Sequence, residues 1–231
     1  MNKRGVFYSV GTGPGDPELL TYQAVKTMEK CAIIALPNSG AAENAVLTIV
    51  SHYIEGKTIV YCDMPMVRDK VLLAATHEKV AKDLSVYLEA GQDVAFLTLG
   101  DPSIYSTAMY VHRQIQKLGY ETAMVAGVPS FCAVAAKLNV SLCEGGQQLH
   151  IIPASYQDID GALAYEGNKV LMKSGKSIIK MREKIDTQEY DVSAVERCGM
   201  ENEKIHTTLD TLQEDSSYFS VLVVKERNVL G

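Results

Sequence analysis

Short apolar runs alternate with amphipathic stretches through the first part of the chain. The apolar runs predict strands at residues 6–10, 31–36, 58–61, 93–99 and 122–125. Between them, apolar side chains recur at helical spacing and predict helices at residues 20–28, 45–54, 70–90, 103–118 and 129–138. Strands that carry few polar residues and alternate with helices are typical of a mainly parallel sheet covered on both faces.

The rhythm of the elements changes at the Gly145-Gly146 pair. Shorter strands are predicted beyond it, at residues 149–152, 170–172, 192–195 and 218–224. We therefore predict an α/β fold of two α/β domains, an N-terminal one at 1–142 with the mainly parallel sheet and a C-terminal one at 147–231 with a mixed sheet. Small molecules often bind between domains, so we expect the ligand in the cleft between these two.

Residues 11–16, Gly-Thr-Gly-Pro-Gly-Asp, form a turn between the first predicted strand and the next helix. The glycine spacing differs from the dinucleotide fingerprint, and Pro14 lacks the backbone donor that a pyrophosphate needs. Two interpretations remain. Asp16 caps a helix that has Pro17 at its first position, or the glycines let the backbone approach a ligand closely.

Two further turns of this kind follow the fourth and fifth predicted strands. They are Gly100-Asp101-Pro102 and Gly127-Val128-Pro129. Asp101 is either the N-cap of the next helix or an acid that binds the hydroxyl or cationic groups of a ligand. Turns after three parallel strands favour a ligand at the carboxyl edge of the sheet.

Composition and charge narrow the class of protein. The chain has 231 residues, 47% of them hydrophobic, and a net charge of −6 without a basic run, so we expect no nucleic-acid partner. Its apolar runs are too short for a membrane span, and its five dispersed cysteines are typical of reduced thiols in the cytoplasm. No metal-ligand cluster and no Ser/His/Asp order are present, so a metal site is not expected.

The chain resembles the tetrapyrrole methylase family over its whole length. The resemblance is carried by residues 10–21 (VGTGPGDPELLT), 42–45 (AENA), 64–66 (MPM) and 98–107 (TLGDPSIYST). Within the family, residues 64–66 and Tyr105-Ser106-Thr107 resemble the precorrin-2/cobalt-factor II C(20)-methyltransferases of cobalamin biosynthesis.

This resemblance implies S-adenosyl-L-methionine as methyl donor, bound largely by backbone groups. The implied donor-binding positions are Pro14, Leu99, Gly100, Asp101, Ile104, Ser130, Phe131, Met172, Cys198, Gly199 and Thr208. Asp101 and Tyr105 are the expected catalytic residues, and Tyr105 either stacks on the flat ring or packs into its helix. Lys173 and Ser174 depart from the family, because many relatives have glycine after the methionine.

The implied substrate is a polycarboxylate tetrapyrrole, precorrin-2 or cobalt-factor II, and the implied assembly is a homodimer. Methyl transfer from an activated sulfonium asks mainly for proximity and orientation in a dry cleft. The cations that could bind substrate carboxylates are Arg68, Lys173, Lys176 and Lys180.

Two other functions remain open. One is a different methyltransferase of this fold, such as a uroporphyrinogen-III methylase or a relative acting on rRNA, although the lack of a basic stripe weighs against RNA. The other is a nucleotide-binding regulatory module without catalysis. Donor turnover separates the module from the enzymes, and the position of the methylated carbon separates the enzymes from each other.

Overall fold

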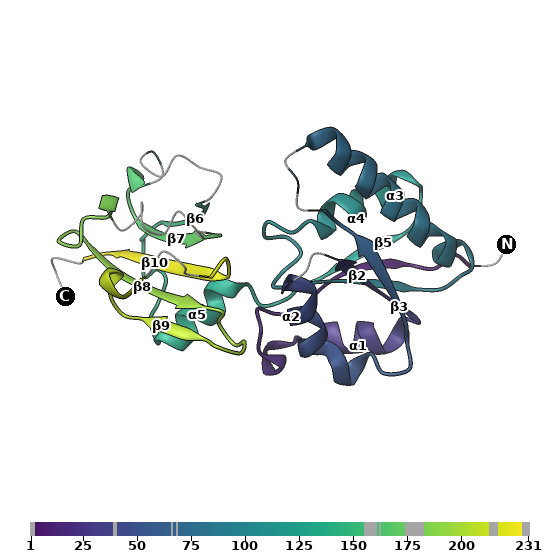
Figure 1. Cartoon of the computed structure of the whole chain (residues 1–231), viewed down its shortest axis with the longest axis horizontal. Helices are drawn as coiled ribbons and strands as arrows, with labels where there is room; N and C mark the ends of the chain where they lie inside the picture. Colours follow the sequence, from purple (N-terminus) through teal and green to yellow (C-terminus); the bar gives the residue numbers. More distant parts are fainter. Residues whose placement is uncertain are drawn as a thin grey trace. The chain divides into compact units, whose positions relative to one another are not determined.

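The computed structural model describes residues 3–38, 41–65, 67, 69–154, 161, 163–173, 183–212 and 217–227. The chain divides into two compact units, Met1–Pro129 and Ser130–Gly231, each built on one sheet (Figure 1). Within the described residues, no helix is both long enough and apolar enough to cross a bilayer.

The sheet of the first unit has five parallel strands in the order β3-β2-β4-β1-β5. The strands are β1 (Phe7–Gly11), β2 (Ile33–Asn38), β3 (Thr58–Asp63), β4 (Val94–Thr98) and β5 (Thr122–Val125). The helices between them are α1 (Tyr22–Lys30), α2 (Ala41–Val50), α3 (Lys70–Glu89) and α4 (Ala108–Lys117). This arrangement confirms the predicted parallel sheet.

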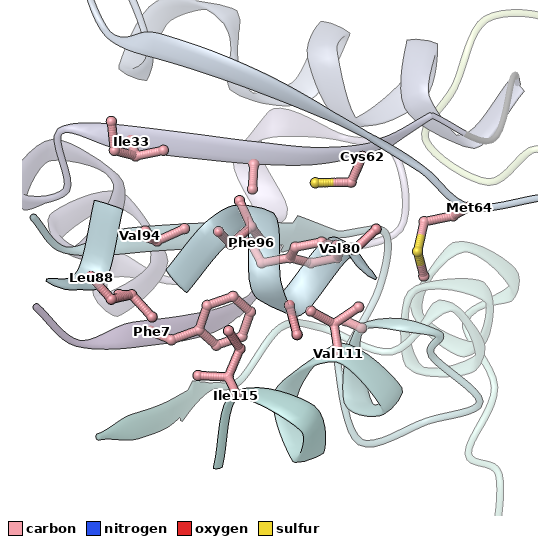
Figure 2. Packing of buried hydrophobic residues seen from close by; sticks show 14 residues of the cluster. Phe7, Ile33, Cys62, Met64, Val80, Leu88, Val94, Phe96, Val111 and Ile115 are labelled. Atoms are coloured by element: carbon pink, nitrogen blue, oxygen red, sulfur yellow. The ribbon is translucent and has the colours of Figure 1, made fainter. Parts of the chain in front are cut away.

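Alternation along the strands gives this sheet a hydrophobic core on each face. In β4, Val94 and Phe96 pack with residues of α3 and α4, in the cluster drawn in Figure 2. Ala95 and Leu97 face the other way, into a cluster with residues of α1 and α2. All four side chains are fully buried, which is why β4 is apolar from Val94 to Leu97.

The second unit is a mixed five-stranded sheet in the order β6-β7-β10-β8-β9. Its elements are α5 (Ser130–Leu138), β6 (Leu149–Pro153), β7 (Asn168–Met172), β8 (Tyr190–Glu196), β9 (Lys204–His206) and β10 (Ser220–Glu226). β6 and β7 are parallel, whereas β10 is antiparallel to both β7 and β8. β7 and β8 therefore run in the same direction and end at the same edge of the sheet.

Three details differ from the sequence prediction. The boundary between the two units falls between Pro129 and Ser130, whereas the predicted N-terminal domain extends to residue 142. The observed boundary lies earlier because α5 packs against β8 and β10 of the second unit. The helix predicted at 103–118 begins only at Ala108. The short strand β9 was not predicted.

Candidate functional site

The three glycine turns of the first unit lie side by side. β1 lies between β4 and β5 in the sheet, with Gly11 opposite Thr98 and Val10 opposite Val125. The turns that leave these strands therefore start at one carboxyl edge, where parallel sheets bind ligands. The predicted grouping of the turns is confirmed.

Backbone hydrogen bonds join the first turn to the second. The Gly100 amide donates to the Gly13 carbonyl at 2.7 Å, and the Gly13 amide donates back to the Gly100 carbonyl at 3.2 Å. Thr12, which is fully buried, donates both its amide (2.9 Å) and its hydroxyl (3.1 Å) to the Thr98 carbonyl. These bonds hold the two turns in a fixed relation before any ligand binds.

Glycine is required where the turns approach one another. A Cβ at Gly127 would lie 2.1 Å from the Gly100 carbonyl oxygen, and one at Gly11 would lie 2.6 Å from the same atom. At Gly100, by contrast, an added Cβ meets nothing within 4 Å, although φ is +74°. The side of Gly100 on which a Cβ would lie thus has room for a ligand to approach the backbone closely.

Asp101 joins the second turn to the third. Its Oδ2 accepts a hydrogen bond from the Gly127 amide at 2.8 Å, and its Oδ1 accepts the Ser103 amide at 2.8 Å and the Ser103 hydroxyl. The carboxylate is buried. The structure therefore gives Asp101 a positioning role between two turns, and its direct contact with the donor stays a prediction.

The N-cap role considered for Asp101 is wrong. α4 begins at Ala108, and Asp101 instead closes an Asx turn onto Ser103. The helix start is organised by Ser106, whose hydroxyl accepts the Ala108 amide at 3.2 Å and bonds the Thr98 hydroxyl at 2.9 Å.

Tyr105 lies in the segment before α4. It has a left-handed backbone with φ of 48° and is 44% exposed, so it does not pack into a helix. Nearby, Pro14 and Gly100 are buried, and Leu99 and Ile104 are partly buried. The capping interpretation of the first turn is confirmed. Asp16 caps a short 3-10 helix, Pro17–Leu19, and its carboxylate accepts the Glu18 amide at 2.9 Å.

The second unit brings another group of predicted residues to one sheet edge. Met172 ends β7 and lies opposite Val221 of β10, which in turn lies opposite Val195 of β8. Cys198 and Gly199 follow β8 at the same edge. Cys198 is buried, and the Gly199 amide donates to the Glu203 carboxylate at 2.7 Å.

A buried polar cluster beside this edge was missed from the sequence. His206 Nε2 lies 2.9 Å from Glu196 Oε1, and its Nδ1 lies 3.0 Å from the Thr211 hydroxyl, which donates to the Thr208 carbonyl at 2.9 Å. The second Glu196 oxygen accepts the Ser217 amide at 2.7 Å. The cluster fastens the turn at Thr208 to β8. No sequence signal pointed to it, because β9, which supplies His206, is only three residues long.

The remaining predicted positions are distributed as follows. Ser130 and Phe131 begin α5, with Phe131 buried. Lys173 follows Met172, is partly buried and has a left-handed backbone with φ of 55°. Burial lowers the pKa of its ammonium group. The other predicted substrate cations, Arg68, Lys176 and Lys180, lie outside the described residues.

The known proteins that this chain is similar to are tetrapyrrole methyltransferases. The chain is 32% identical to the probable cobalt-precorrin-2 C(20)-methyltransferase of Methanocaldococcus jannaschii, over 94% of this chain and 95% of the relative. It is 34% identical to the cobalt-precorrin-2 C(20)-methyltransferase of Salmonella typhimurium, over 73% of each chain. Its fold matches the crystal structure of uroporphyrin-III C-methyl transferase from Thermus thermophilus complexed with S-adenyl homocysteine, with a TM-score of 0.72, 19% identity, and coverage of 96% of this chain and 97% of the other.

The family model for tetrapyrrole (corrin/porphyrin) methylases matches residues 6–213. This range includes all three turns of the first unit and the edge of the second sheet at Met172 and Cys198. The predicted resemblance is thereby confirmed. The chain belongs to the tetrapyrrole methylases, the family of enzymes that methylate corrins and porphyrins.

Proposed function

We propose that this chain transfers a methyl group from S-adenosyl-L-methionine to carbon 20 of a precorrin-2 type tetrapyrrole in cobalamin biosynthesis, and that its substrate carries cobalt. The observation that carries the proposal is the similarity to two relatives named cobalt-precorrin-2 C(20)-methyltransferases, one of them over almost the whole chain. The Tyr105-Ser106-Thr107 sequence beside the second turn agrees with the same branch.

The donor-binding residues proposed in the first unit are those at its turns. They are Pro14, Leu99, Gly100, Asp101 and Ile104. The open space at Gly100 and the rigid bonding among the turns fit a ligand held by backbone rather than by side chains. In the second unit, we assign Met172, Cys198, Gly199 and Thr208 to the adenine side, and Ser130 and Phe131 to a further donor contact.

When bound, S-adenosyl-L-methionine supplies an activated methyl group, so the chain need not provide a strong acid or base. The residues of the chain instead bind and orient the methyl donor and the tetrapyrrole. Gly100 presents backbone, Asp101 keeps two turns in register, and Tyr105, which is exposed and outside the helix, is proposed to contact the flat ring. Holding the two reactants close together and correctly oriented in this way lowers the barrier to methyl transfer.

A paired turnover assay tests the proposed reaction. The protein is incubated without oxygen with isotopically labelled S-adenosyl-L-methionine and either cobalt-factor II or metal-free precorrin-2, and the product is analysed by mass spectrometry and NMR. Label at carbon 20 of the cobalt form is the expected result. Label only on the metal-free form would overturn the cobalt assignment, and label at another carbon, or on uroporphyrinogen III, would overturn the carbon-20 assignment.

The donor site has a separate test with a matched control. Met172→Ala is expected to weaken the binding of S-adenosylhomocysteine several-fold in calorimetry. Met124→Ala, at a β5 methionine that is 48% exposed, is expected to leave binding unchanged. Equal affinities for the two variants would remove Met172 from the site. Light scattering of the purified protein tests the predicted homodimer.

A further inference from the structure

Residues 197–203, which we call the β8–β9 turn, carry the predicted donor residues Cys198 and Gly199. Three residues of this turn have a left-handed backbone, with φ of 54° at Arg197, 73° at Gly199 and 61° at Asn202. Glycine adopts this region at little cost, whereas arginine does so only under strain. Strain of this kind persists only where surrounding contacts hold the backbone in place.

Hydrogen bonds at the start of the turn supply part of this hold. The Met200 amide donates to the Arg197 carbonyl at 2.8 Å, and Arg197 Nε donates to the Glu201 carbonyl at 2.9 Å. The Arg197 amide donates to the Phe219 carbonyl at 3.1 Å, next to the first residue of β10. These bonds anchor the start of the β8–β9 turn to the sheet.

Glu203 holds the middle of the turn. Its Oε2 accepts the Gly199 amide at 2.7 Å, and its Oε1 lies 3.1 Å from the Lys137 ammonium group of α5. Both interactions involve charged groups, which makes them stronger than hydrogen bonds between neutral groups. The Glu203 side chain is only 21% exposed, and hydrogen bonds that are shielded from water are strengthened further.

The same carboxylate joins two elements that carry proposed donor contacts. Ser130 and Phe131 lie in the first turn of α5, and Lys137 lies in its last turn. Cys198 and Gly199 lie on the β8–β9 turn, and α5 packs on β8 itself. One side chain therefore sets the position of the turn relative to the helix, so that the contacts on the two elements keep a fixed spacing.

We propose that Glu203 is a positioning residue for the methyl donor, which holds the β8–β9 turn against α5 in the shape that binds S-adenosyl-L-methionine. The inference rests on the proposed function for the identity of the ligand, and on the contacts of Glu203 for the residue. Glu203 acts through the Gly199 amide and not by touching the donor. A turn that is already ordered improves affinity because binding does not have to order it.

Three substitutions separate the two contacts of Glu203. Glu203→Ala removes both. Glu203→Gln keeps an oxygen that can accept the Gly199 amide but loses the ion pair, and Lys137→Met removes the ion pair while the carboxylate stays in place. Glu201→Ala is the matched control, because Glu201 is an exposed acid of the same turn and its loss changes the net charge as Glu203→Ala does.

The Kd of S-adenosylhomocysteine is measured for each protein by calorimetry. We expect Glu203→Ala to bind about tenfold more weakly than the parent, the loss typical of one charge-assisted hydrogen bond. Glu203→Gln and Lys137→Met should lose about threefold, since the Gly199 amide keeps an acceptor in both, and Glu201→Ala should stay within about twofold of the parent. Rescue by glutamine thus identifies the Gly199 bond as the main contribution.

The melting temperature without ligand separates positioning from support of the fold. A Glu203 that only stabilises the second unit would lower the Tm and leave the Kd of the folded protein unchanged, and this outcome would overturn the proposal. Equal Kd values for Glu203→Ala and Glu201→Ala would also overturn it. If Glu203→Ala does not fold, Glu203→Gln and Lys137→Met carry the test, and parental affinity in both overturns the proposal.

Failure of the proposed function is recognised separately. If the parent protein does not bind S-adenosylhomocysteine, the assigned donor and this inference both fail. If the parent methylates a carbon other than carbon 20, the reaction assignment fails while the comparison at Glu203 still holds. If the parent methylates carbon 20 and the Glu203 variants bind S-adenosylhomocysteine as it does, the reaction stands and the inference fails.

Discussion

The Gly127 amide donates a 2.8 Å hydrogen bond to Asp101 Oδ2, and this bond is buried. It joins the turn after β4 to the segment after β5. The other oxygen of the same carboxylate, Oδ1, accepts a hydrogen bond from the Ser103 amide. One side chain therefore sets the relation between two backbone segments that we assign to donor binding.

The substitution Asp101→Asn tests this role. An amide can accept through only one of its two terminal atoms, so either the Gly127 or the Ser103 amide would face an N–H group. We expect a loss of about 1–3 kcal/mol in the free energy of unfolding, measured by urea titration, together with weaker binding of S-adenosylhomocysteine. Asp16→Asn is the control. Because asparagine caps as well as aspartate, it should change stability by less than about 0.5 kcal/mol. Equal effects at the two positions would contradict the positioning role.

Gly127→Ala tests the close approach of the turns. The new Cβ would lie 2.1 Å from the Gly100 carbonyl oxygen, and both groups belong to backbone that cannot rotate away. We expect destabilisation of about 3 kcal/mol, read from the urea midpoint. Gly146→Ala places its Cβ where no atom lies within 4 Å and should be neutral or stabilising by up to about 1 kcal/mol. A Gly127→Ala protein as stable as Gly146→Ala would show that the turns can separate.

The His206–Glu196 pair offers a third test. Both side chains are buried, with 10% and 6% exposure, at a separation of 2.9 Å. His206→Leu leaves a buried carboxylate without this partner and should reduce stability by about 3 kcal/mol. The double variant His206→Leu/Glu196→Leu should recover a large part of that loss. A double-mutant cycle with no coupling between the two positions would contradict the predicted interaction.

Cysteine reactivity gives a fourth prediction. Burial raises the pKa of the Cys31 and Cys62 thiols to about 12, and Cys198 is buried, whereas Cys132 and Cys143 are exposed. An aromatic disulfide reagent at pH 8 should therefore modify Cys143 rapidly and the buried three only on unfolding. Cys132 should react in the native protein but more slowly than Cys143, because burial raises the pKa of its thiol. Rapid modification of Cys31 or Cys62 in the native protein would contradict the packing described for the first unit.

The same two thiols make stability fall at high pH. In the unfolded chain they ionise near pH 9, but in the folded chain only near pH 12. Between these values the unfolded chain holds fewer protons, so the thiol contribution to the free energy of unfolding decreases as pH rises. Urea midpoints at pH 8 and pH 10 should show this decrease. A Cys31→Ala/Cys62→Ala variant should show a smaller one.

The sequence predicted the parts of the site that local chemistry determines. Clusters of glycine and proline between apolar runs are typical of turns, so the turns at Gly13, Gly100 and Gly127 were recognisable, and the apolar strands placed them on one sheet. The role of Asp101 was not recognisable, since a helix cap and an Asx turn have the same local pattern and Gly127 is 26 residues away. The left-handed backbone of Lys173 did have a signal, since the family resemblance places glycine at this position in many relatives.

The bonding of the three turns also sets an order of events during synthesis. The Thr21 hydroxyl donates to the Ala126 carbonyl, 105 residues further along the chain. The Asp101 carboxylate accepts its hydrogen bond from the Gly127 amide, which is synthesised later. The turn after β1 leaves the ribosome before β4 and β5, which are the neighbours of β1 in the sheet. The proposed donor cradle therefore cannot close until nearly the whole first unit has emerged. Ribosome-bound chains that end before Gly127 should lack it, and the first length that binds S-adenosylhomocysteine would mark the point at which the three turns meet.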